Sequence, residues 1–266
     1  MLPPDDAPHF TNTLLQRPST HGIDVVTILK HFAIVTYAVA PERVRPHVDD
    51  RFELDCFTAP DGTSRVWVSV VPFLDWDFHF ARLPQLKFRF GQTNYRTYVI
   101  DRVTQHRAVW FFGTTLGGWP VVVPHYLWQL PWHYGRIKFD CVFDSAHARY
   151  SRYKMTTQSD WAAIDLELED TGQPITQLDG FENMEAGLVR LTHPLMGVYY
   201  GRDGKLGSYN VWHNRLRCTV GQVRQARISL LDHLGIVPFG EQMAPHSVLI
   251  QPETEFIVQL PPKRFT

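Results

Sequence analysis

Short runs of β-branched and aromatic residues recur along most of this chain, and they constrain its fold more than any other feature. In the clearest run, Ile164-Asp165-Leu166-Glu167-Leu168-Glu169, apolar and acidic residues alternate strictly. Successive side chains of a strand point to opposite faces, so the pattern predicts a strand with one buried and one solvated face. The runs that we expect to form strands are 32–39, 65–73, 93–100, 108–115, 136–143, 148–154, 161–169 and 254–260.

The segments between these runs contain turn signals and few helices. Two Asp-Gly pairs, Asp61-Gly62 and Asp203-Gly204, predict hairpin turns. Many strands with few helices predict a mostly β (α+β) fold, in which a curled antiparallel sheet or barrel carries a few peripheral helices. We expect one domain over residues 1–266, with 1–22 as an N-terminal arm. Helix is favoured in only four segments: 41–48, 120–130, 180–191 and 222–234.

Charge and cysteine content exclude several classes of function. The chain has 26 basic and 27 acidic residues and a net charge of -1, so it lacks the basic surplus of a protein that binds nucleic acid or an anionic membrane. Three cysteines, Cys56, Cys141 and Cys218, lie far apart. They favour neither a disulfide framework nor a zinc site, and indicate a reducing, cytoplasmic location. No apolar run has the roughly 18 residues of a membrane-spanning helix.

Motifs for cofactors, metals and nucleophiles are incomplete. Gly113 and Gly118 have phosphate-loop spacing, but Trp119 stands where that loop needs lysine. None of the 13 histidines belongs to a His-Glu-x-x-His motif. His125 and His133 would need a third ligand to hold a metal. There is no Gly-x-Ser-x-Gly elbow. We therefore expect neither a cofactor nor a metal.

One polar cluster lies within a predicted strand. Asn94, Arg96 and Tyr98 share one face by the period of two. If that face is interior, Arg96 would clamp a carboxylate, because a guanidinium matches a carboxylate with two parallel hydrogen bonds. The alternative is that Arg96 forms a structural ion pair with an acidic residue.

A second cluster, residues 125–136, is dense in aromatic and polar groups. Two histidines, two tryptophans, two tyrosines and an arginine fall within it. This density is typical of a concave site with apolar walls and a few polar groups. A packing corner rich in aromatic residues is the alternative.

Several segments in order resemble one known family. The most distinctive is Asn-x-Arg-Thr-Tyr-Val at 94–99, and the others are 31–37, 41–46, 65–73, 109–112, 130–133, 191–200 and 204–206. Together they resemble the family called domain of unknown function 2071, over about residues 30–215. That family is similar in fold to acetoacetate decarboxylase, a cone-like β structure with a central cavity. The resemblance implies a pocket among the strands.

The resemblance also shows what this chain departs from. In acetoacetate decarboxylase a Schiff-base lysine follows a Trp-Gly-Phe-Pro type of turn. Here Trp128-Gln129-Leu130-Pro131 is followed by Trp132 and His133, with no lysine. An imidazole forms no stable imine with a ketone, so the resemblance does not carry over decarboxylation through a Schiff base.

These observations lead to one functional hypothesis and two alternatives. We expect a small-molecule-binding protein whose cavity accepts a compact ligand with a carboxylate or carbonyl group. The alternatives are an enzyme (hydrolase, isomerase or lyase) that uses a histidine acid/base or a histidine-bound metal, and a non-catalytic homo-oligomerisation module. The hypothesis assigns an anion clamp to Arg96, hydrogen bonding to Asn94 and Tyr98, acid/base chemistry to His133, and apolar walls to Trp128, Trp132 and Tyr134.

Overall fold

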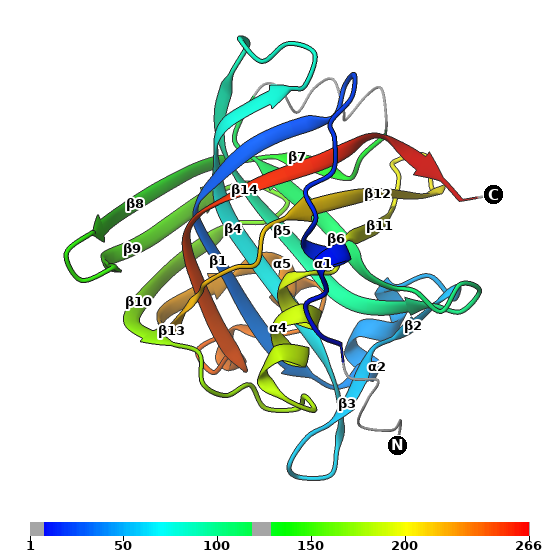
Figure 1. Cartoon of the computed structure of the whole chain (residues 1–266). Helices are drawn as coiled ribbons and strands as arrows, with labels where there is room; N and C mark the ends of the chain where they lie inside the picture. Colours follow the sequence, from blue (N-terminus) through cyan, green and yellow to red (C-terminus); the bar gives the residue numbers. More distant parts are fainter. Residues whose placement is uncertain (1–7, 119–128, 266) are drawn as a thin grey trace.

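Seven long strands close into a barrel in the computed structural model, which describes residues 8–118 and 129–265 (Figure 1). The ring closes because β1 pairs on one side with β4 and on the other with β14. All neighbours in the ring are antiparallel except β6 and β11, which are parallel. In spatial order the ring consists of β1 (Val25–Val39), β4 (Ser64–Phe80), β5 (Phe88–Asp101), β6 (Arg107–Leu116), β11 (Met196–Tyr200), β12 (Leu206–His213) and β14 (Ser247–Arg264).

The sheet continues beyond the barrel as a four-stranded extension, here called the wing. β14 also pairs with β13, and antiparallel pairing then leads to the edge strand β8. Figure 1 shows the wing projecting from one side of the barrel. The wing contains β13 (Thr219–Ile228), β10 (Ile164–Pro174), β9 (Arg149–Gln158) and β8 (Arg136–Asp144). Three short strands lie off this path: β2 (Phe52–Leu54), β3 (Cys56–Thr58) and β7 (Trp132–Tyr134).

Helices in the described ranges are short and peripheral. Two of the four predictions are confirmed, since 41–48 contains α2 (Pro41–Val44) and a 3-10 turn at Arg45–His47, and 180–191 contains most of α4 (Met184–Thr192). Most of the helix predicted at 120–130 lies outside the described residues. The remaining helices are α1 (Asn12–Leu15), α5 (Ser229–His233) and a 3-10 turn at Phe239–Glu241. None of the described helices is long and apolar enough to span a membrane.

The helix predicted over 222–234 is wrong for most of its length. Residues up to Ile228 form β13, and only α5 is helical. β13 has an irregularity in its pairing with β10. Glu167 pairs with Gln225 and the next residue, Leu168, pairs with Val223, so Arg224 is an extra residue without a partner position on β10. Because of this extra residue, successive apolar side chains are three residues apart at this point instead of two, and a spacing of three is also typical of one face of a helix.

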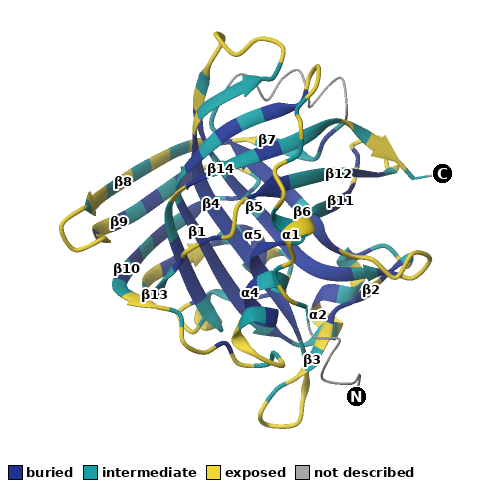
Figure 2. Cartoon of the chain, in the orientation of Figure 1, coloured by how far each residue is buried: buried dark blue, intermediate teal, exposed yellow. Residues whose placement is uncertain are grey.

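The barrel strands are buried on both faces. Along β4, Trp67, Val71 and Phe73 belong to one apolar cluster, whereas Val68 and Val70 belong to a second. The second cluster includes side chains of the wing strands β9, β10 and β13, so the wing covers one side of the barrel. Figure 2 shows the resulting buried band along the barrel strands. Each fully buried aliphatic or aromatic side chain contributes about 1.5–3 kcal/mol.

Candidate functional site

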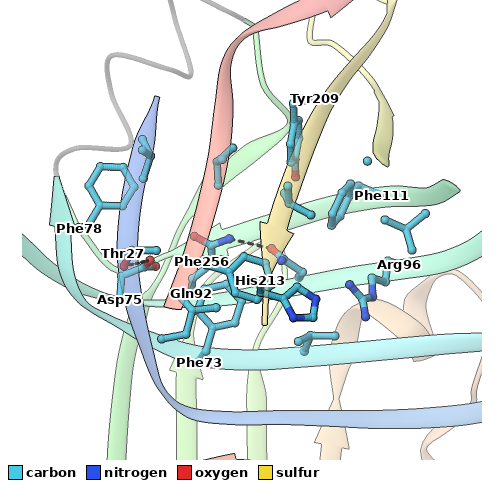
Figure 3. Close-up of a pocket in the computed structure, with 18 of the residues that line it drawn as sticks. Thr27, Phe73, Asp75, Phe78, Gln92, Arg96, Phe111, Tyr209, His213 and Phe256 are labelled. Atoms are coloured by element: carbon cyan, nitrogen blue, oxygen red, sulfur yellow. Dashed lines mark hydrogen bonds between the residues drawn. The ribbon is translucent and has the colours of Figure 1, made fainter. Parts of the chain in front are cut away.

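A cavity lies inside the barrel, with mostly apolar walls (Figure 3). The space open to the centres of water molecules is about 90 Å³, several times the roughly 15 Å³ that one buried water needs. Phe73, Phe111 and Phe256 form part of the wall. The polar side chains of the lining include Thr27, Asp75, Gln92, Asn94, Arg96 and His213.

The pairing of β4 with β5 places polar side chains in a row along the cavity. Asn94 is opposite Val71, and Gln92 is opposite Phe73. Directly paired residues share a sheet face, so the alternate residues Gln92, Asn94 and Arg96 all face the interior. The amide oxygen of Asn94 accepts hydrogen bonds from Gln92 Nε2 at 2.9 Å and from Thr114 Oγ1 at 3.0 Å.

Arg96 is the charged group of this row and has an incomplete set of partners. The residue is 9% exposed. Its Nη2 donates to the carbonyl oxygen of Leu191 at 2.9 Å, while its buried Nε has no hydrogen-bond partner among the described residues. Leu191 lies in the last turn of α4, where the carbonyl ends of the helix favour a cation. No carboxylate within 8–118 or 129–265 forms an ion pair with Arg96, so the structure does not supply the ion pair that we considered as the alternative.

Tyr98 lies beside Arg96 and helps to position it. Its hydroxyl donates to the same Leu191 carbonyl at 3.1 Å and contacts Ser69 Oγ at 2.9 Å. The guanidinium carbon of Arg96 is 5.7 Å from the centre of the Tyr98 ring. The shared face predicted for the two residues is therefore observed, although Tyr98 is not among the residues that line the cavity.

His213, at the end of β12, is a cavity residue that the sequence did not reveal. Its Nε2 is 2.7 Å from the Thr192 carbonyl oxygen, and its ring stacks on Phe256 with centroids 4.5 Å apart. Burial lowers the pKa of His213 to about 4; hydrogen bonds to the backbone carbonyls of Asn214 and Thr192 oppose this shift, and the charge of Arg96 adds to it. The neighbouring His193, with its ring centroid 4.0 Å away, has a pKa lowered to about 3, chiefly by burial. Both rings are neutral at pH 7, so among the described residues of the wall the positive charge is that of Arg96.

Asp75 is the second cavity residue that the sequence pattern did not single out. The residue is 3% exposed. Its Oδ1 accepts a hydrogen bond from Thr27 Oγ1 at 2.9 Å, and its buried Oδ2 has no partner in the described part of the chain. Burial raises the pKa of this carboxyl to about 7. A signal was available, because Asp75 continues the alternation of Val71 and Phe73 on the inward face of β4.

The aromatic cluster at 125–136 divides between different environments. Trp132 lines the cavity, whereas His133, its neighbour on β7, stacks on Trp161 with ring centroids 3.8 Å apart and is not among the lining residues. Tyr134 is 67% exposed. Adjacent strand residues point to opposite faces, so Arg96 and His133 do not share this cavity. His125 and Trp128 lie outside the described residues.

The described residues offer no metal centre. No group of three or more histidine, cysteine, aspartate or glutamate side chains in 8–118 or 129–265 is arranged to hold an ion.

Comparison with known proteins agrees with the resemblance seen in the sequence. The model of the family named domain of unknown function 2071, described as an uncharacterized conserved protein, matches residues 28–255. This chain belongs to that family. No curated protein matches the chain significantly.

Solved structures similar to this chain include acetoacetate decarboxylases. Acetoacetate decarboxylase from Legionella pneumophila has a TM-score of 0.58 at 12% identity, covering 96% of this chain and 94% of its own. An acetoacetate-decarboxylase-like enzyme from Sphingomonas wittichii has a TM-score of 0.57 at 10% identity, covering 94% and 99%. The enduracididine biosynthesis enzyme MppR, complexed with pyruvate, has a TM-score of 0.55 at 11% identity, covering 93% and 92%. These similarities confirm the predicted fold.

Proposed function

We propose that this protein binds a small carboxylate- or carbonyl-bearing molecule in the barrel cavity, with Arg96 as the anion-binding group. The observation that carries the proposal is the buried guanidinium of Arg96, which lines the cavity and has no carboxylate partner in the described part of the chain. A buried charge without a counter-ion is unfavourable, so an anionic ligand gains energy that it would not gain at the surface.

Charge balance in the cavity supports a monoanion over a neutral or dianionic ligand. Burial leaves His213 neutral at pH 7, so one full positive charge lies in the wall at Arg96. Burial also favours the uncharged form of Asp75. A single carboxylate would neutralise Arg96, while a second would enter apolar surroundings without a cation.

Binding in this proposal is noncovalent. None of the chain's lysines is among the described residues that line the cavity, which supports a mode without a Schiff base. Asn94, beside Arg96, supplies a further polar contact, and Trp132 an apolar wall. An acid or base role for His133 would need a ligand outside this cavity, so the proposal does not use it.

The test is a binding titration with acetate, pyruvate and acetoacetate against the neutral analogues acetamide and acetone. We expect the carboxylates to bind the wild type and the neutral analogues to bind weakly. Loss of a hydrogen-bonded charge costs about 1.5–3 kcal/mol, so Arg96→Met should weaken carboxylate binding about 10- to 100-fold. Arg96→Lys, which keeps the charge but loses the planar fork, should fall between the two.

The matched control is Arg89→Met. Arg89 lies on the same strand but is exposed, with its guanidinium 3.7 Å from the Trp76 ring. Carboxylate binding should survive this change. Equal affinity of the wild type and Arg96→Met for every carboxylate would remove the proposed site.

A further inference from the structure

We propose that the ligand is an elongated monocarboxylate, longer than a two- or three-carbon acid, with an uncharged hydroxyl or carbonyl oxygen at its far end that meets Asp75. This inference rests on the proposed function, because it takes the carboxylate at Arg96 as given. It adds a second polar contact and therefore a length and a terminal group for the ligand.

The two polar groups lie far apart along the cavity wall. Asp75 pairs with Phe90 across β4 and β5, while Arg96 pairs with Ser69 six residues further along. At about 3.3 Å per residue, the two Cα atoms are separated by roughly 20 Å along the strands. Figure 3 shows Asp75 with Thr27 on one side of the view, Arg96 on the other and Gln92 between them. Acetate or pyruvate at Arg96 would not reach Asp75.

The surroundings of Asp75 suit a hydrogen bond to a ligand. Thr27 donates to one carboxyl oxygen, which fixes the orientation of the group. The other oxygen is buried and unpartnered within the described ranges, and such a group is rare in a folded protein unless a ligand or water meets it. In its protonated form the carboxyl donates one hydrogen bond to an oxygen acceptor.

The stretch between the two ends suits a hydrocarbon chain. Val71 and Phe73 line it from β4, and Phe256 lines it from β14. Gln92 and Asn94 lie on the same stretch and are joined to each other by the bond from Gln92 Nε2 to Asn94 Oδ1. The cavity therefore combines a guanidinium, a mostly apolar stretch and a buried carboxyl group.

The experiment is a titration of the wild type with two matched series of acids. One series is the straight-chain alkanoates of four, six, eight and ten carbons, and the other is the same acids with a terminal hydroxyl. Chain lengthening should improve binding in both series. At the length that spans the cavity, the hydroxyl should tighten binding about 3- to 10-fold, which is typical of one buried neutral hydrogen bond.

Two variants test whether the tighter binding of the hydroxylated acids depends on Asp75. Asp75→Leu should bind the alkanoates as well as the wild type does, and lose the preference for the hydroxyl. Thr27→Val, an isosteric change that removes only the hydroxyl orienting Asp75, should reduce the preference and serves if Asp75→Leu does not fold.

The titrations distinguish a failure of the contact at Asp75 from a failure of carboxylate binding at Arg96. If alkanoates bind through Arg96 but the hydroxyl gives no gain at any length, or a gain that survives in Asp75→Leu, this inference is overturned and the proposed function stands. A terminal ammonium that binds more tightly than the hydroxyl would also overturn it, because it would require an ionised Asp75. If no acid binding depends on Arg96, both proposals fail.

Discussion

Replacing Asp75 by asparagine should stabilise the protein at alkaline pH but not at acidic pH. Burial raises the pKa of this carboxyl from 3.8 to about 7 in the folded protein. The unfolded chain therefore releases the proton near pH 4, whereas the folded protein retains it until about pH 7. Stability that the wild type has below pH 4 is lost as the pH rises through this window.

The size of the effect follows from the pKa shift. One pKa unit corresponds to 1.36 kcal/mol, so a shift of roughly three units corresponds to about 4 kcal/mol at pH 8. Asparagine has no proton to lose and keeps the hydrogen bond from Thr27. We therefore expect the stability difference between Asp75→Asn and wild type to move by about 2–4 kcal/mol in favour of the variant between pH 4 and pH 8.

The assay is urea unfolding of the ligand-free protein, followed by tryptophan fluorescence, at pH 4, 5, 6, 7 and 8. Other titrating groups are common to both proteins, so the difference between the two curves isolates Asp75. Asp50→Asn is the control, since it makes the same chemical change at a side chain that is fully exposed. Parallel curves for the wild type and Asp75→Asn would refute a buried carboxyl with a raised pKa.

Three further predictions concern Arg96, the two buried histidines and Gly113. Arg96→Met should leave the ligand-free protein at least as stable as wild type in urea, because it removes a buried charge without a carboxylate partner; a loss of more than about 3 kcal/mol would identify Arg96 as a structural group instead. The pKa values of His193 and His213 are lowered to about 3 and 4 in the folded protein. As the pH falls, the unfolded chain therefore binds protons at these two residues near pH 6.5, whereas the folded protein binds them only at about pH 3 to 4. The stability that the two neutral histidines contribute should therefore be lost from pH 6.5 to pH 4, opposite in direction to the Asp75 contribution. His213→Gln should lose less stability than wild type over this range in thermal unfolding, and an unchanged slope in the variant would contradict this. A Cβ at Gly113 would lie 2.5 Å from Trp161, so Gly113→Ala should destabilise by about 1–3 kcal/mol in urea and alter Trp161 fluorescence, and a neutral effect would argue against the close approach.

The strands were predictable because their signal is local. Alternation at residues 164–169 and the apolar run along β4 reflect a repeat of two that any strand facing a core must keep. The same repeat correctly predicts that Asn94, Arg96 and Tyr98 share one face of β5. It failed at β13, where the extra residue Arg224 gave the apolar side chains a helix-like spacing.

The site was only partly predictable because barrel closure brings distant segments together. Arg96 was found from its own strand, but its influence on His213 depends on β12 joining the ring more than 100 positions later. The density of aromatic residues at 125–136 indicated a pocket but not which of these side chains would line it. On β7, Trp132 points into the cavity and His133 points toward Trp161. Asp75 was overlooked because a single acidic residue near the end of a strand normally indicates a solvated position.

A crystal structure of the protein with bound hexanoate would test the central claim most directly. We expect the carboxylate oxygens to lie within about 2.7–2.9 Å of guanidinium nitrogens of Arg96, with the alkyl chain directed along the barrel toward Asp75. Hexanoate bound outside the barrel, or inside it with its carboxylate away from Arg96, would contradict it.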